Sequence, residues 1–126
     1  MDLALSSARR FELAATLVGG ITLGLLSLFL VGEVFGGDLS GVVHLVQLVP
    51  LAALLALGWR SPNLAGVLLL AIGGALALAY FVETADSDTV SAVERALVAG
   101  LFLVPPIAAG VLFLVAARRP RGATVR

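Results

Sequence analysis

Two polar side chains, His44 and Gln47, are the residues of this sequence best suited to bind a ligand. They are its only histidine and glutamine, and they share an otherwise apolar run with Pro50. On a helix, residues three apart turn about 60° from one another, so these three lie on one broad face. Pro50 has no N–H and leaves the carbonyl of Val46 without its helical donor. We therefore predict a ligand-binding patch of His44 and Gln47, facing the interior of a helix bundle beside a kink at Pro50.

A structural role would explain the same residues. Gln47 would then hydrogen-bond to a neighbouring helix, worth about 1 kcal/mol, and His44 would reach the outer interface. With one histidine and no cysteine, the chain lacks the ligands of a typical metal or haem site, and we expect neither metal nor cofactor. It also lacks a phosphate-binding loop, a nucleophile elbow and a basic face with interleaved aromatics. We therefore expect neither an enzyme nor a nucleic-acid binder.

A second proline site, Pro105-Pro106, lies near the middle of the last apolar run. Its two missing N–H groups free the carbonyls of Leu101 and Phe102, so we predict a helix kink here. Some transporters build ion sites from such carbonyls, but proline kinks are also common in plain membrane bundles. The sequence has neither an internal repeat nor a carboxylate within the run, which favours a structural kink.

The elements that position these residues are four uncharged apolar runs. The chain has 126 residues, 60% of them hydrophobic and 13% charged, more apolar surface than so small a soluble domain can bury. Each run has about the twenty residues that a helix needs to cross a bilayer. We predict a single-domain, all-α, polytopic membrane protein: an antiparallel bundle of four transmembrane helices. The helices span roughly residues 11–32, 42–59, 64–82 and 94–117, with a mobile tail at 118–126.

Arginine placement predicts the orientation. Seven of the eight arginines lie at the N-terminus, at the second loop or in the tail, whereas the other two loops are acidic with only Arg95. The positive-inside rule then places both termini in the cytoplasm of a multi-pass plasma-membrane protein. The first run is longer than the apolar region of a signal peptide and is followed by no small-x-small cleavage site, so we keep it as a helix.

Several residues near the helix ends have expected structural roles. Trp59, Arg60 and Tyr80 are predicted interfacial anchors. Glu12 and Glu33 are expected to be solvated at helix ends. The spacing Ser91-x-x-Glu94 predicts a capping box at the start of the fourth helix.

Small residues form faces on which helices can approach closely. The first helix carries Ala15-x-x-x-Gly19 and Gly20-x-x-x-Gly24, and the third carries an alanine stripe at positions 71, 75 and 79. Such faces pack helices either within one bundle or between copies, and we favour packing within the bundle.

Four motifs resemble a family of small four-helix prokaryotic membrane proteins of unknown function. They are Pro50, Leu57-x-Trp59-Arg60-x-Pro62, Ala65-Gly66-x-Leu68-Leu69 and Pro105-Pro106-x-x-x-Gly110-x-Leu112-Phe113. The resemblance extends from the end of the first helix to the end of the fourth. The family often has a glycine pair after the Trp-Arg turn, where this chain has Ala65-Gly66. The resemblance implies the architecture and a prokaryotic source, and it assigns no activity. All eight basic residues are arginine, and with the abundance of Ala, Gly, Val and Leu this composition also indicates a GC-rich bacterial or archaeal source.

Taken together, the residues favour a non-enzymatic membrane subunit that acts through helix packing. Its partners would be the lipid bilayer and either further copies or another membrane protein. The alternative is a permease for a small solute or ion, in which a patch of His44, Gln47 and Pro50 faces the Pro105-Pro106 kink.

Overall fold

The computed structural model describes residues 6–120, which are helical and contain no strand. The elements are α1 (Ser7–Phe35), the 3₁₀ helix η1 (Leu39–Val43), α2 (His44–Arg60), α3 (Pro62–Thr84), α4 (Ala92–Val98), the π-helix η2 (Ala99–Leu103) and α5 (Val104–Arg118). Taking Leu39–Arg60 and Ala92–Arg118 as continuous, four helices within the described residues are long and apolar enough to cross a membrane. The part of the predicted tail at 121–126 lies outside the described residues.

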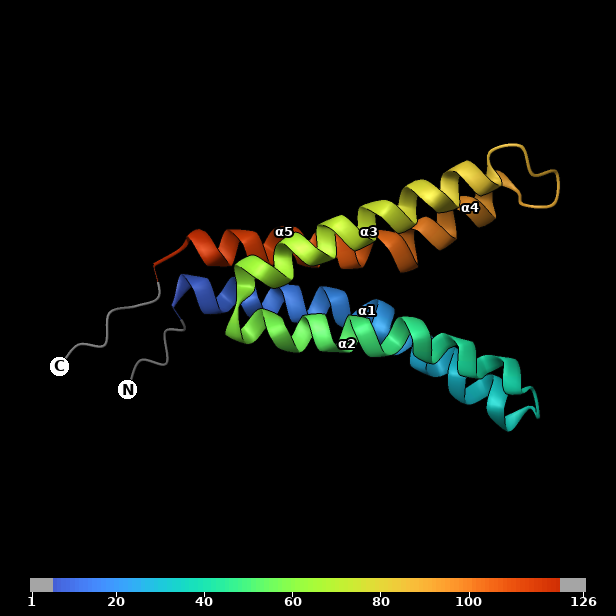
Figure 1. Cartoon of the computed structure of the whole chain (residues 1–126), viewed down its shortest axis with the longest axis horizontal. Coiled ribbons are helices and arrows are strands. Elements are labelled where there is room, and N and C mark those ends of the chain that lie inside the picture. The colour runs from blue at the N-terminus through green and yellow to red at the C-terminus, as the bar shows by residue number, and fades with distance from the viewer. Residues whose placement is uncertain (1–5, 121–126) are drawn as a thin grey trace.

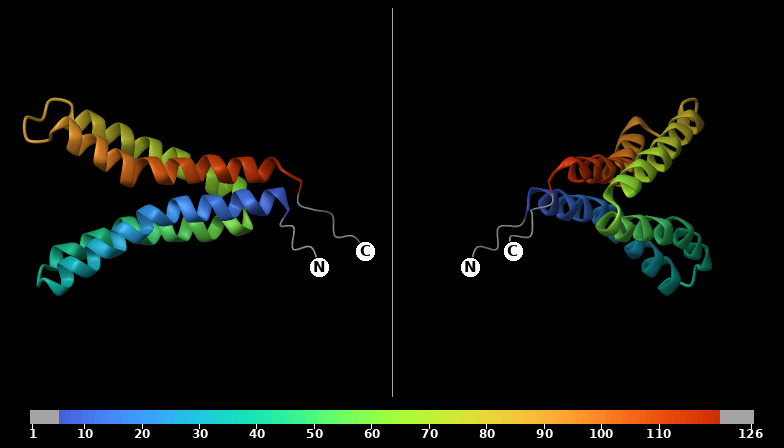
Figure 2. Two further views of the ribbon diagram at one scale, coloured as in Figure 1. Left: turned by 180° about the vertical axis from the view of Figure 1, so that it is seen from behind. Right: turned by 60° about the vertical axis from the view of Figure 1, so that its left-hand side comes forward.

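The helices form two antiparallel hairpins that meet at one end and diverge at the other (Figures 1 and 2). The first hairpin is α1 with α2, and the second is α3 with α4, η2 and α5. The most extensive interfaces join α5 to α1 and to α3, while α2 packs against α1 and α3. We call residues 7–26, 51–73 and 105–118 the packed half, and residues 27–50 and 74–104 the splayed half.

The packed half contains the whole hydrophobic core of the described chain. Its largest fully buried side chain is Phe113, and the ring lies against Gly58 so closely that a Cβ there would overlap it. A Cβ at Gly66 would lie 2.8 Å from the carbonyl oxygen of Gly110, so α3 and α5 are in close backbone contact. The remaining core side chains are mostly alanine and leucine: Ala8, Ala15, Leu26, Leu51, Leu55, Ala65, Leu69, Ala109 and Ala116.

The splayed half buries almost nothing. Within its ranges only Gly41 and Thr84 are buried, although it is as apolar in sequence as the packed half. Side-chain size on the facing surfaces explains the change. Where small residues such as Gly19 and Ala109 meet, the hairpins touch, and where Phe29 faces Phe102, with ring centroids 6.0 Å apart, they separate.

The start of α4 confirms the predicted capping box. The Ser91 hydroxyl accepts the backbone N–H of Glu94 at 3.1 Å, and the backbone N–H of Ser91 donates to the Glu94 carboxylate at 2.8 Å. Next to it, Arg95 donates from Nε to the Thr84 hydroxyl at 3.1 Å and from its guanidinium to the Thr84 carbonyl. These bonds tie the start of α4 to the end of α3.

The fourth predicted helix is not one regular helix. It consists of α4, the π-helical segment η2 and α5, and the irregularity precedes the prolines. Pro105 and Pro106 occupy the first turn of α5, so their missing N–H groups remove no hydrogen bond within α5 itself. Pro50 is different: α2 continues through it without a break, and a kink there stays a prediction.

The predicted small-residue faces divide into two groups. Gly19 packs in the core, where an added Cβ would lie 2.5 Å from a Leu55 methyl group. Gly20 and Gly24 have open space beside them, and the alanines at 71, 75 and 79 of α3 are exposed. Packing within the bundle was therefore the wrong expectation for these two faces.

Candidate functional site

The first part of the candidate site is an acid–imidazole pair at the turn between α1 and α2, in the splayed half. His44, the first residue of α2, has its Nε2 atom 3.3 Å from a carboxylate oxygen of Glu33. The two side chains are 30% and 36% exposed. Gly41 makes room for this contact, because a Cβ there would lie 2.8 Å from the same carboxylate oxygen. Glu33 is therefore not simply a solvated helix end, since it joins α1 to the start of α2.

An aromatic contact connects this pair to the second hairpin. The ring of Phe29 lies 6.2 Å from the His44 ring on one side and 6.0 Å from the Phe102 ring on the other. Both distances are typical of tilted aromatic pairs. Phe29 thus contacts both hairpins at the point where they begin to diverge.

On the side of the aromatic contact nearer the packed half, a hydrogen bond joins the two hairpins. The Thr22 hydroxyl on α1 donates to the Leu101 carbonyl in η2 at 2.7 Å, and Thr22 is buried. Leu101 precedes Pro105 by four residues, so its carbonyl has lost its helical donor, as the sequence predicted. The sequence analysis missed Thr22 as the group that satisfies this carbonyl. The spacing pointed to it, since Thr22 follows Ala15 and Gly19 by seven and three residues on the same face.

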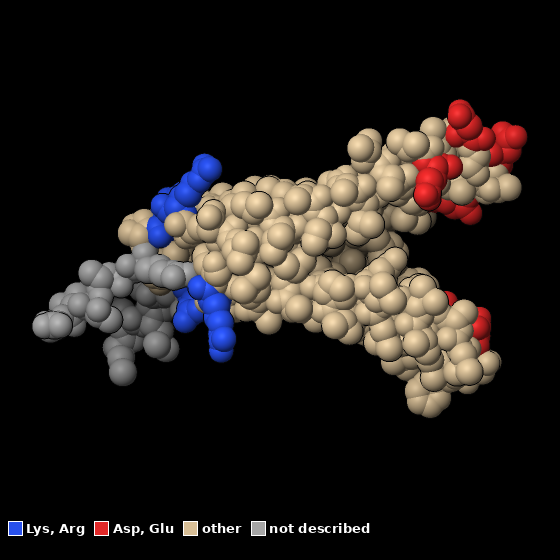
Figure 3. Space-filling model, in the orientation of Figure 1, with Lys and Arg blue, Asp and Glu red and all other residues tan. Residues whose placement is uncertain are grey.

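The space between the diverging hairpins is a wedge, which we define by its floor at Thr22–Leu101 and Phe29–Phe102. The space-filling view shows the two arms separate on either side of it (Figure 3). The α1 face that points into the core continues into the wedge. Leu26, on the core side, is 4% exposed, whereas Phe29, three residues further on, is 49% exposed. The wedge is thus an outward continuation of the core faces, left open.

Gln47 belongs to the wedge. It lies four residues before the buried Leu51, so both residues are on one face of α2. Gln47 is exposed, and its amide bonds to no other residue in the range 6–120. The structure therefore places Gln47 on an open surface, not inside the bundle as expected. His44 is half-buried beside Glu33, and Pro50 is exposed.

The packed end carries a polar network that the sequence analysis missed. Glu12 was expected at a solvated helix end, but it is only 3% exposed, with a carboxylate oxygen 3.3 Å from the Arg9 guanidinium. One turn on, the Thr16 hydroxyl donates to the Glu12 carbonyl and accepts the indole N–H of Trp59, at 2.9 Å in each case. Extending the face of Ala15 and Gly19 back by one turn would have identified Glu12 as buried.

The predicted anchors lie near the ends of the helices. Trp59 is partly exposed, and the Arg9 guanidinium lies 5.0 Å from its ring centroid, within cation–π range. Arg60 ends α2 and is exposed. Tyr80 is edge-on to Phe81 at 5.7 Å. Trp59 thus also joins α2 to α1, and interfacial anchoring of all three residues stays a prediction.

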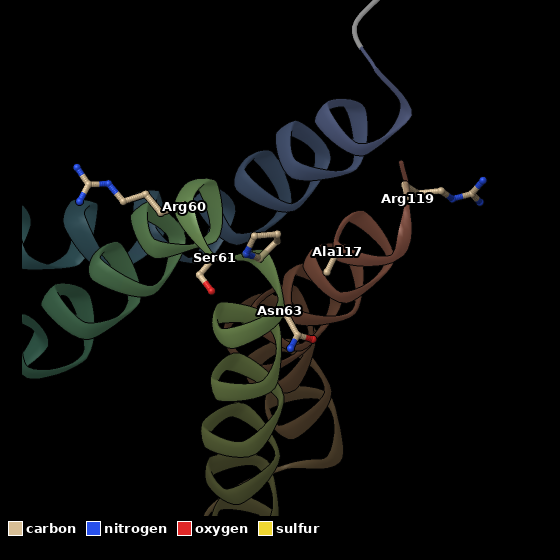
Figure 4. A pocket seen from close by; sticks show the side chains of 6 residues that line it. Arg60, Ser61, Asn63, Ala117 and Arg119 are labelled. Atoms are coloured by element: carbon tan, nitrogen blue, oxygen red, sulfur yellow. The ribbon is translucent and has the colours of Figure 1, made fainter. Parts of the chain in front are cut away.

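A shallow open depression at the α2–α3 turn is not a convergent site. It is lined by Arg60, Ser61, Pro62, Asn63, Ala117 and Arg119. Figure 4 shows the Arg60 and Arg119 side chains pointing away from it in different directions. Across residues 6–120, no three His, Asp or Glu side chains are grouped to hold a metal ion.

The tips of the two arms are acidic (Figure 3). On the first tip, the Ser40 backbone N–H donates to the Asp38 carboxylate at 2.8 Å, and this bond lowers the pKa of Asp38 below its usual value. The carboxylate therefore stays ionised at neutral pH.

Residues 3–124 match the family model described as "Domain of unknown function (DUF7670)", so the chain belongs to this family. Neither the curated proteins nor the solved structures contain a match. The resemblance based on the Trp-Arg-x-Pro turn was also to an uncharacterised family, and the identity of the two families stays a prediction.

Proposed function

We propose that this member of the DUF7670 family is a non-enzymatic integral membrane protein that works by packing against other membrane helices. These helices belong to further copies of the chain or to a larger assembly in which it is an accessory subunit. One observation carries the proposal: the alanine stripe at positions 71, 75 and 79 of α3 is exposed along its whole length. In lipid, such small-residue faces allow the close backbone approach that drives helix association.

The extent of exposed apolar surface supports membrane insertion. In each of the four candidate spans, between 17% and 28% of the most apolar window is buried. In water, so much exposed apolar surface would cause aggregation, whereas lipid solvates it. Of the described residues, the arginines other than Arg95 gather at one end of the molecule, and the carboxylates other than the buried Glu12 gather at the other (Figure 3). The positive-inside rule then favours cytoplasmic termini in the plasma membrane.

Cysteine labelling in intact cells tests this orientation. The chain has no cysteine, so single substitutions give unambiguous labels. Ser40→Cys and Thr89→Cys should react with an impermeant reagent added outside, and Ser61→Cys should react only after permeabilisation. The reverse pattern would contradict the proposed topology.

Crosslinking in the native membrane followed by mass spectrometry tests the function. We expect crosslinks to a second copy or to a defined membrane partner, together with co-purification in mild detergent. Ala75→Leu should weaken this association by covering the alanine stripe, whereas the matched change Ala53→Leu, at an exposed position of α2, should not. A clean monomer without any partner would overturn the proposal.

The permease alternative has less support. It needs the carbonyls freed by Pro50 and by Pro105-Pro106 to face one cavity, but the Leu101 carbonyl already accepts the Thr22 hydroxyl. Gln47 and Pro50 are exposed. Unchanged solute fluxes in a His44→Ala, Gln47→Ala double variant would eliminate the permease alternative.

A further inference from the structure

We infer that the wedge is a docking site for one transmembrane helix of another protein, apolar along its middle and basic at the end beside the acidic tips. This inference rests on the proposed function and names the chemistry of the partner. It concerns a different surface from the alanine stripe of α3.

The walls of the wedge fit an apolar helix. On the α1 side, Phe29 is 49% exposed although it continues a buried face. On the opposite side, Phe102 of η2 faces Phe29, with ring centroids 6.0 Å apart. The α1 surface extends the helix face that forms the core, so a docked helix would continue the packing of the bundle outward.

A polar group within the wedge favours a helix over loosely ordered lipid chains. Gln47 lies four residues before the buried Leu51 and so on the same face of α2, and its amide bonds to no other residue of the described chain. Acyl chains offer it no partner. A helix can present a serine, threonine or asparagine side chain, and such interhelical hydrogen bonds stabilise packing in membranes.

Charge complementarity indicates which residues the partner helix carries at the end beside the arm tips. The tips of the arms carry the carboxylates Glu33, Asp38, Glu83, Asp86, Asp88 and Glu94. Of the described arginines only Arg95 is at this end, and its guanidinium is bonded to Thr84. A second copy in the wedge would bring the same carboxylates close together, and phospholipid phosphates would add negative charge. A helix with lysine or arginine at this end complements the tips instead.

A reconstituted binding assay tests the inference. The full chain with Thr89→Cys carries a fluorescence donor in phosphatidylcholine vesicles. The probe is a labelled peptide of about twenty leucines and alanines with three lysines at each end, long enough to span the bilayer. The matched control peptide has three glutamates at each end. We expect half-saturation at an about fivefold lower mole fraction for the lysine peptide, with the difference reduced by salt because exposed charges are screened.

Two variants locate the binding site. Gln47→Trp should fill the wedge and abolish binding of the lysine peptide, whereas Val111→Trp, at an exposed position in the packed half, should not. Neutralising most of the second tip with Glu83→Gln, Asp86→Asn and Asp88→Asn should reduce the preference for lysine over glutamate.

Any of three results overturns the inference: the two peptides bind equally, neither peptide binds, or Gln47→Trp leaves binding of the lysine peptide unchanged. Energy transfer between two copies that Gln47→Trp abolishes assigns the wedge to a second copy, which overturns the inference and supports the proposed function. If the chain is crosslinked to partners in the native membrane and Gln47→Trp does not change these crosslinks, the inference is overturned but the proposed function still stands, because association then does not need the wedge.

Discussion

The two halves of this molecule are similarly apolar but differently packed. In the packed half, Gly19, Gly58 and Gly66 let neighbouring helices touch, and the core closes around Phe113. In the splayed half, the facing residues are Phe29 and Phe102, and the hairpins diverge. Lipid solvates apolar side chains as well as a protein interior does, so hydrophobicity alone gives two helices no reason to associate. The comparison shows that side-chain shape decides where this bundle closes.

The halves also differ in their polar contacts. At the packed end, a chain of contacts from Arg9 through Glu12 and Thr16 to Trp59 joins α1 to α2 around a buried carboxylate. In the splayed half, Glu33 and His44 meet at a partly exposed hairpin end.

Removing the central ring of the packed half should have the largest effect. Phe113 is 0% exposed, and Phe113→Ala should lower the free energy of unfolding by about 3 kcal/mol, mainly through the cavity left behind. Phe35 is 88% exposed in the splayed half, so Phe35→Ala should change it little. Titration with a denaturing detergent measures both variants. Equal losses would mean that the two halves are packed alike.

Adding a methyl group in the packed half should be nearly as harmful. A Cβ at Gly58 would overlap the Phe113 ring, so Gly58→Ala should cost about 2 kcal/mol. Gly24 has nothing within 4 Å of its Cβ position, and Gly24→Ala should be neutral or slightly stabilising. The same detergent titration compares the two variants. If Gly24→Ala lowered the free energy of unfolding and Gly58→Ala did not, the face of Gly58 would not be the packed one.

The hydrogen bond at the floor of the wedge should have a moderate effect. Thr22→Val removes the donor to the Leu101 carbonyl and should cost about 1 kcal/mol. The control Ser27→Ala removes a bond that returns to the carbonyl of Leu23 on its own helix, and it should cost less. If Thr22→Ser, which keeps the hydroxyl, is as unstable as Thr22→Val, the bond is not what joins the hairpins.

The smallest effect is expected at the hairpin end. Glu33 and His44 are about one-third exposed, and pairs of this kind are worth at most about 1 kcal/mol. A double-mutant cycle with Glu33→Gln and His44→Ala measures the coupling between them. A coupling of several kcal/mol would show that this end is as firmly held as the packed half.

Helix positions followed from apolar runs and charge clusters, and the capping box of α4 followed from Ser91 and Glu94. The divergence of the hairpins did not, because it depends on which residues face one another across helices. Gly19 and Gly20 are adjacent in the sequence, yet only Gly19 faces another helix. The freed carbonyl of Leu101 was predictable from Pro105, but the donor on Thr22 lies 79 residues away in the chain. Glu12 looked solvated because sequence position indicates distance from a helix end and not which side a residue faces.

The separation of the arm tips tests the central claim most directly. Spin labels at Phe35→Cys and Thr89→Cys, one on each tip, report this distance in vesicles. A second pair, at Arg10→Cys on α1 and Ala117→Cys on α5, reports the distance between the two hairpins in the packed half. If the halves differ as described, the tip pair lies well beyond the roughly 10 Å at which neighbouring helix axes pack, and the pair at the packed end stays short. A tip distance as short as that of the packed-end pair would contradict it, because the bundle would then be closed along its whole length.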